Sequence, residues 1–177
     1  MNDGNLEERL RRLEDRLELE DLVVRYSVAI DDQDFEALND IYATDAVAEG
    51  SPPVRGREKV VDALRVARSN LGVTIHTPDF LLLDFESETA ATGTQGAHLE
   101  LAMGGEAVFG AMRYLDRNKK EDGRWWIVSR EQKFFYVTPW QGLRDTLLSS
   151  SRIRWPGAEP AAAHLGPSGL EAVRGDD

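Results

Sequence analysis

The sequence contains no cysteine, and this absence removes several kinds of chemistry at once. Disulfide bonds, thiolate metal sites and thiol nucleophiles are all excluded. No apolar run reaches the length of about 18 residues that a membrane-spanning helix needs. The N-terminus also lacks the apolar core of a signal peptide. We therefore expect a cytoplasmic protein.

Basic residues are scarce, with 21 Lys and Arg against 32 Asp and Glu. The net charge of -11 argues against binding to nucleic acid or to an anionic membrane, because both need clustered Lys and Arg. Histidine is rare as well, and His76, His98 and His164 are the only three. The length of 177 residues fits one domain with one core.

The N-terminal part of the chain has the apolar spacing of a helix. Residues 5–30 carry apolar side chains every three to five positions, which predicts one long helix. Four leucines in its first half follow the alternating spacing of four and three that is typical of a short coiled coil. They are Leu6, Leu10, Leu13 and Leu17.

Two shorter helices are predicted next. Asp34 can cap a second helix whose apolar face runs from Phe35 to Tyr42. Residues 56–72 predict a third helix that Gly72 closes. A short strand is expected between them, at residues 45–50.

Residues 73–140 change to the period of strands and contain four strand-like runs. Turns are predicted near 86–88, at 104–105 and at 118–123, and their shortness favours an antiparallel meander. Helices that precede one antiparallel sheet indicate an α+β fold with two layers. We expect this domain to span residues 1–150, and the Pro-, Gly- and Ala-rich segment 151–177 to be a flexible tail.

Two histidines fall on the first pair of long strands. If these strands turn near residue 87, His76 lies opposite His98, and directly opposed residues share a face. The apolar neighbours of His76 on its own strand, Phe80 and Leu82, indicate that this face points inward. The two imidazoles are therefore predicted to be neighbours on the inner wall of a curled sheet, where they would suit acid–base chemistry.

The acidic pair Asp31-Asp32 ends the long helix, where the helix dipole disfavours negative charge. One explanation is that Asp31 accepts a hydrogen bond from one nitrogen of His76, which fixes the tautomer of the ring and leaves the other nitrogen free as a base. Tyr26, on roughly the same side of the helix, would donate a hydrogen bond to a substrate oxygen.

Simpler interpretations of the same residues stay open. The acidic pair also fits a solvated turn, and each histidine also fits a structural role. A metal site made of His76, His98 and either Asp31 or Glu49 has suitable ligand types, but no two of these ligands have a tight local spacing. We therefore expect no metal and no cofactor.

Four stretches resemble the SnoaL-like superfamily, within the nuclear transport factor 2-like fold. They read LEDLVVRYSVAIDDQDFEALNDIYATDAV, GREKVVDAL, TIHTPDFLL and DGRWWIVSREQKFFYVTPW, and the resemblance covers residues 5–145. It implies an α+β cone, also called cystatin-like, in which N-terminal helices close a curved and mostly antiparallel sheet.

The more specific resemblance is to the dehydratase-like branch of this superfamily, which includes scytalone dehydratase and hexachlorocyclohexane dehydrochlorinase. Asp31 and His76 stand where this branch has its catalytic dyad, and His98 stands where scytalone dehydratase has a second catalytic histidine. Arg130 lies near the position of the dehydrochlorinase active-site arginine. However, Gly110 or Ala111 replaces a pocket asparagine, so the substrate of the relatives does not transfer.

The resemblance implies a cofactor-independent lyase of dehydratase type that acts on a hydrophobic, even polycyclic, small molecule. The residues expected to contact the substrate are Tyr26, Tyr42, Met112, Arg130 and Phe134. Alternatives are a polyketide cyclase or isomerase with the same dyad, a non-catalytic binding module, or an assembly subunit of the same fold. A homodimer or higher homo-oligomer is predicted, because a curved sheet leaves an outer face that pairing would cover.

Overall fold

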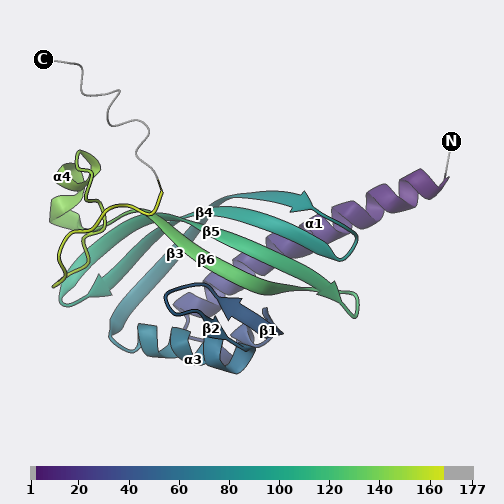
Figure 1. The fold of residues 1–177 in the computed structure, drawn as a ribbon, viewed down its shortest axis with the longest axis horizontal. Coiled ribbons are helices and arrows are strands. Elements are labelled where there is room, and N and C mark those ends of the chain that lie inside the picture. The colour runs from purple at the N-terminus through teal and green to yellow at the C-terminus, as the bar shows by residue number, and fades with distance from the viewer. Residues whose placement is uncertain (1–2, 166–177) are drawn as a thin grey trace, which may run out of the picture.

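The computed structural model describes residues 3–165 (Figure 1). The first elements are helix α1 (Asp3–Asp31), helix α2 (Phe35–Leu38), strands β1 (Tyr42–Ala48) and β2 (Val54–Arg55), and helix α3 (Arg57–Arg68). Four long strands follow, β3 (Leu71–Phe85), β4 (Ala90–Met103), β5 (Glu106–Glu121) and β6 (Arg124–Pro139). A 3-10 turn, η1 (Trp140–Gly142), and helix α4 (Leu143–Leu147) come after them.

One curved sheet of six strands, in the order β2-β1-β6-β5-β4-β3, forms the body of the molecule (Figure 1). All neighbouring strands are antiparallel except β1 and β6, which are parallel. Helix α1 crosses the sheet and contacts β3 and β6, and α3 contacts β1. The predicted α+β cone, with a meander of four strands closed by N-terminal helices, is confirmed.

The core lies between α1 and the inner face of the sheet. Leu22 and Ile30 of α1 are fully buried there, as are Trp125 and Ile127 of β6. Two acidic side chains of α1 fix the helix to β6, because Asp15 accepts from the indole N–H of Trp125 at 2.8 Å and Glu18 accepts from its backbone N–H at 2.8 Å. This anchoring sets which face of α1 points inward.

Helix α2 is shorter than predicted and ends at Leu38. The backbone N–H groups after Leu38 donate to carbonyls three residues earlier in the chain, not four. The N–H of Ile127 in β6 donates to the carbonyl of Ile41 at 3.0 Å. This hydrogen bond joins the chain to the sheet, so Tyr42 begins β1 instead of ending a helix. The predicted Asp34 cap is present, with its side chain accepting from the Ala37 N–H at 3.0 Å.

Helix α3 also ends earlier than predicted. Ser69 stops it, since both its N–H and its hydroxyl bond to the carbonyl of Val66, at 3.2 and 2.8 Å. Gly72 lies in β3 and closes no helix. The early end leaves Arg68 in the last turn of α3, directly before the strand that carries His76.

A β-bulge in β3 changes which side chains face inward. Pro78 pairs with Ala97 and Phe80 with Gly96, so Asp79 is an extra residue without a partner. Beyond the bulge the inward positions are Leu81 and Leu83. The prediction that Phe80 and Leu82 face inward is wrong, since they are 50% and 69% exposed.

Phe80 covers Gly96 on the outer face of the sheet. A Cβ atom at residue 96 would lie only 2.2 Å from Cε1 of the Phe80 ring, so the close approach requires glycine. This contact holds the bulged strand against β4.

The C-terminal segment differs from the predicted flexible tail over residues 151–165. Ile153 is buried and bridges Val137 of β6, and the ring of Trp155 packs edge-on against Phe134 at a centroid distance of 5.6 Å. Apolar burial therefore holds this segment against β6. Residues 166–177 of the predicted tail lie outside the described residues. Among residues 3–165, no helix is long and apolar enough to cross a membrane.

Candidate active site

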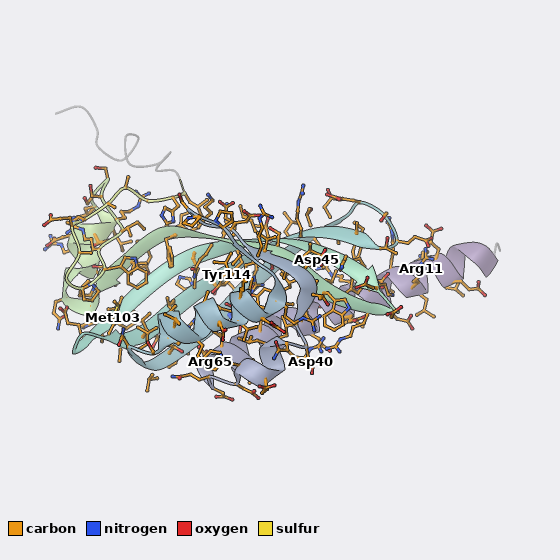
Figure 2. All side chains as sticks on the ribbon, turned by 60° about the horizontal axis from the view of Figure 1, so that its bottom comes forward. Arg11, Asp40, Asp45, Arg65, Met103 and Tyr114 are labelled. Atoms are coloured by element: carbon orange, nitrogen blue, oxygen red, sulfur yellow. The ribbon has the colours of Figure 1, made fainter. Side chains whose placement is uncertain are left out.

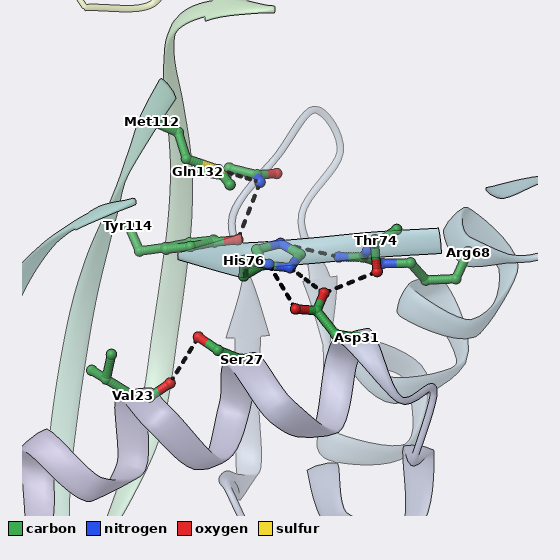
Figure 3. A network of polar contacts seen from close by, with 9 residues as sticks. All are labelled: Val23, Ser27, Asp31, Arg68, Thr74, His76, Met112, Tyr114 and Gln132. Atoms are coloured by element: carbon green, nitrogen blue, oxygen red, sulfur yellow. Dashed lines mark hydrogen bonds and ion pairs between the residues drawn. The ribbon is translucent and has the colours of Figure 1, made fainter. Parts of the chain in front are cut away.

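The acidic residue that ends α1 binds the histidine near the start of β3 (Figure 3). Oδ1 of Asp31 lies 2.6 Å from Nδ1 of His76, and Oδ2 accepts from the backbone N–H of His76 at 2.6 Å. The hydroxyl of Thr74 donates to Oδ1 at 2.9 Å. The imidazole is 2% exposed and the carboxylate 19%. The predicted contact between Asp31 and His76 is therefore present, and the acidic pair is more than a solvated turn.

The other nitrogen of His76 faces a cation. Nη2 of Arg68 lies 3.4 Å from Nε2 of His76 (Figure 3). A guanidinium only donates hydrogen bonds, and a carboxylate only accepts them. The two neighbours together favour the neutral tautomer that carries its proton on Nδ1 and has a bare lone pair on Nε2. That is the form in which an imidazole serves as a base.

Burial on its own raises the pKa of the Asp31 carboxyl, but the hydrogen bonds from the ring and the N–H of His76 and from Thr74 outweigh it. The pKa of Asp31 is therefore below its ordinary value of 3.8. A carboxyl with a lowered pKa in the folded state stabilises the protein above its unfolded pKa, and this stabilisation is lost as pH falls through the folded pKa.

Replacing Asp31 with Asn should therefore reduce the free energy of unfolding most at a pH well above 3.8, and the deficit should shrink as pH falls below 3.8 and through the lowered folded pKa of the wild-type carboxyl. Denaturant unfolding of both proteins at several pH values measures this difference. Asp32→Asn, at the exposed neighbouring position, is the matched control and should leave the free energy of unfolding at neutral pH nearly unchanged. A deficit for Asp31→Asn that does not change with pH would contradict the assignment.

An aromatic and cationic cluster lies deeper between α1 and the sheet. The guanidinium of Arg130 lies over the rings of Tyr26 and Tyr114, 4.1 and 4.4 Å from their centroids. Asp116 accepts from its Nε and Nη2 at 2.8 and 2.6 Å. Burial alone lowers the pKa of Arg130, but Asp116 raises it well above its ordinary value, so the cation persists. The cluster is a buried ion pair flanked by two aromatic rings inside an apolar core.

Tyr42 and Tyr114 are neutral phenols. Burial raises the pKa of both hydroxyls well above the ordinary value. In Figure 3 the Tyr114 ring points its hydroxyl toward the imidazole of His76. A buried neutral phenol next to a base can donate a hydrogen bond to an oxygen of a bound molecule.

The remaining predicted contact residues lie on the inner face nearer to the C-terminal segment. Met112 and Phe134 are buried partners across β5 and β6. The amide of Gln132 lies 2.9 Å from Sδ of Met112 and 3.5 Å from the hydroxyl of Tyr114 (Figure 3). His164 accepts from the Phe134 N–H at 3.2 Å, and the two ring centroids lie 5.8 Å apart, so the C-terminal segment packs against this end of β6.

The prediction that His98 neighbours His76 is wrong. The β3–β4 turn is centred one residue later than predicted and the bulge at Asp79 shifts the pairing again, so His76 faces Leu99 and His98 faces Thr77. A register change of one residue moves a side chain to the other face. His98 is 56% exposed on the outer face, where it binds Asp79 at 2.8 Å.

A metal site that combines both histidines is not formed, because they lie on opposite faces of the sheet. Within residues 3–165, no group of three His, Asp or Glu side chains is arranged to hold a metal ion. Glu49, the other proposed ligand, accepts from the hydroxyl of Ser129 at 3.1 Å instead.

Sequence reasoning missed several polar residues of the site. Arg68, Tyr114 and Gln132 lie in the network around His76. Gln95 of β4 is completely buried, and neither its amide nitrogen nor its oxygen has a partner among the described residues. Inward-facing polar residues in an apolar sheet are the signal that would have found Gln95 and Gln132. Arg68 has no comparable signal, because basic residues are common in the last turn of helices.

The fold and the site allow comparison with known proteins. The SnoaL-like domain family matches residues 11–131, which is more than half of the chain. The chain belongs to the SnoaL-like domain family. Sequence comparison with proteins of curated function finds no match.

Several solved structures of other proteins are similar to this one. The crystal structure of LinA has a TM-score of 0.70 and 27% identity, covering 76% of this chain and 95% of LinA. A hexachlorocyclohexane dehydrochlorinase, LinA type 2, has a TM-score of 0.70 and 23% identity over 85% of this chain and 99% of its own. A protein of Novosphingobium aromaticivorans, provisionally described as a scytalone dehydratase, has a TM-score of 0.70 and 21% identity over 88% and 96%. They confirm the predicted resemblance.

Proposed function

We propose that this SnoaL-like protein is a cofactor-independent lyase of dehydratase type, in which His76 removes a carbon-bound proton from a hydrophobic small molecule. One observation carries the proposal: a buried imidazole has a carboxylate on Nδ1 and an arginine, which cannot take its proton, beside Nε2. A merely structural histidine does not need this arrangement of opposite charges on its two nitrogens.

The elimination step balances without a co-reactant. Nε2 of His76 takes the proton from one carbon, and the electron pair of that C–H bond forms a carbon–carbon double bond. The bond from the adjacent carbon to the leaving group breaks. A hydroxyl group receives the proton held by Nε2 of His76 and departs as water, whereas a halide departs as an ion and the Nε2 proton passes to solvent. Asp31 stabilises the imidazolium that forms, because its carboxylate is already hydrogen-bonded to Nδ1.

The other polar groups would act on the charge that develops on the substrate. Arg68, whose Nη1 is buried without a partner among the described residues, would stabilise the leaving group or an oxyanion. Tyr114 would donate from its neutral hydroxyl, and Tyr26 and Tyr42 would line the same interior. Met112 and Phe134, on the same inner face of the sheet, favour an apolar substrate body.

The structural relatives favour elimination over other uses of the same base. LinA is 27% identical to this chain, and the LinA type 2 structure is described as that of a hexachlorocyclohexane dehydrochlorinase. Loss of hydrogen chloride and loss of water both begin with proton removal next to a carbon that carries a leaving group. Cyclisation and isomerisation begin with the same proton removal but keep every atom of the substrate.

A panel of apolar compounds tests the proposal. Each compound carries a hydroxyl or chlorine on the carbon next to an acidic C–H bond, and mass spectrometry follows the products. We expect loss of water or hydrogen chloride from at least one compound, and exchange of the acidic hydrogen in deuterated water. Products of unchanged mass would favour the cyclase or isomerase. Tight binding with neither exchange nor turnover would contradict the enzymatic function.

Replacing Arg68 with Gln is expected to lower kcat about 10²-fold, with a smaller change in KM, because a preorganised cation is lost where charge develops. Arg68→Lys is the matched variant and should keep part of the activity, since it retains the charge but not the forked geometry. Steady-state kinetics on the compound identified in the panel measure both effects. Equal kcat values for the wild type and Arg68→Gln would exclude Arg68 from the reaction.

A further inference from the structure

Helix α1 has a second apolar face that nothing in the described part of the chain covers. Six of its apolar side chains are each more than half exposed. They are Leu6, Leu10, Leu13, Leu17, Val24 and Val28. At 3.6 residues per turn, all six lie within a sector of about 60°. We call this sector the α1 stripe.

The α1 stripe lies opposite the face that packs on the sheet. Leu19, Leu22 and Tyr26 face the core, and the two contacts of Trp125 with α1 fix that side against β6. The N-terminal part of α1 extends past the sheet, and Arg11, labelled in Figure 2, lies on this part. A second helix can therefore approach the α1 stripe without meeting the sheet of the same chain.

The residues that flank the α1 stripe carry opposite charges on its two sides. Glu7, Glu14 and Asp21 recur every seven residues along one edge, and Arg9 and Arg16 recur every seven along the other. Leu10, Leu17 and Val24 occupy heptad position a, with Leu6 and Leu13 at position d, which puts the acidic residues at e and the basic residues at g.

This charge pattern selects both the partner and its direction. In a parallel pair of identical helices, each g residue meets the e residue that follows it on the other helix. Arg9 and Arg16 would then meet Glu14 and Asp21 of a second copy. An antiparallel pair would place like charges together. A lipid surface fits poorly, because acidic residues border the α1 stripe and the chain carries a net charge of -11.

We propose that two copies of this chain associate through α1 as a parallel two-stranded coiled coil over residues 6–24. All residues of the α1 stripe except Val28, which follows the coil, form the seam, and the two sheets lie on opposite outer sides. Glu20 is the one charged residue at position d within these bounds, and Arg16 compensates it by a contact of 2.8 Å in the same helix. This inference goes beyond the proposed function and does not depend on it.

Sedimentation equilibrium of the full chain over a wide concentration range tests the association. The wild type should reach twice the mass of one chain. The variant Leu10→Glu/Leu17→Glu should raise the dissociation constant at least ~10-fold, because it places charges in an apolar seam. Val66→Glu, at an equally exposed apolar position on α3, is the control and should leave the constant unchanged. A wild type of single-chain mass throughout, or a seam variant that associates like the wild type, would overturn the proposal.

The direction of the pair is tested by cross-linking, which is unambiguous because the chain has no cysteine of its own. Leu10→Cys alone should form a disulfide-linked dimer under mild oxidation, since position 10 meets itself in a parallel coil. Circular dichroism checks that each variant keeps its fold. Positions 6 and 24 would meet in an antiparallel coil over residues 6–24, because a d residue then faces an a residue. Cross-links that form only when Leu6→Cys is mixed with Val24→Cys would therefore refute the parallel arrangement.

Discussion

Replacing His76 with Ala is expected to lower turnover about 10²–10⁴-fold, the usual contribution of a positioned general base. The effect should fall on kcat, because the imidazole acts on the proton being transferred and contributes little to holding the substrate. A benzisoxazole probe, whose ring opens when a base removes its carbon-bound proton, allows the measurement before the natural substrate is known. Ring opening is followed by absorbance for both proteins.

His98→Ala is the matched control for this experiment. It removes the same ring from the neighbouring strand, but from the outer face, where the ring is 56% exposed and bound to Asp79. We expect His98→Ala to react with the probe like the wild type. Equal losses in the two variants, or full activity of His76→Ala, would contradict the assignment of the base.

Replacing Asp116 with Ala should lower the free energy of unfolding by about 3–5 kcal/mol, the cost of leaving one partner of a buried ion pair without the other. Only 4% of the Asp116 side chain and 5% of the Arg130 side chain are exposed. The Arg130 cation would stay between two tyrosine rings with no anion. Denaturant unfolding at neutral pH measures the change.

Asp45→Ala provides the comparison, because Asp45 pairs with Lys119 at 3.0 Å but its side chain is 69% exposed. A surface pair of this kind contributes about 0–1 kcal/mol. The combined replacement Asp116→Leu/Arg130→Met should recover much of the loss, since it removes both charges and keeps the volume. If Asp116→Ala were no more harmful than Asp45→Ala, the buried pair would not stabilise the core.

The dyad was predictable because both of its residues occupy positions that local sequence fixes well. Asp31 follows from the end of a long apolar period, and His76 from the start of a strand after the third helix. Neither position depends on the pairing between strands. The same is true of the meander, whose turns follow from short polar and glycine-containing segments.

The position of His98 could not be predicted in this way. Its face depends on the register of β3 against β4, and one extra residue at Asp79 reverses that face. Pro78 and Gly96 are residue types that occur at bulges, but they do not fix which residue is left without a partner. The contact that stabilises the bulge, Phe80 over Gly96, joins residues of two strands. Arg68 was missed for a related reason, because its contact with His76 joins the last turn of α3 to β3, and local sequence does not fix how these two elements meet.

The central claim is that Asp31 holds His76 with its proton on Nδ1 and with Nε2 unprotonated, facing Arg68. A ¹⁵N NMR spectrum of the neutral His76 ring tests it most directly, with Asp31→Asn recorded alongside. We predict a protonated Nδ1 and a bare Nε2 in the wild type, and a mixture of the two tautomers once the carboxylate is removed. A wild-type ring protonated on Nε2, or a tautomer that does not respond to Asp31→Asn, would contradict this account of the site.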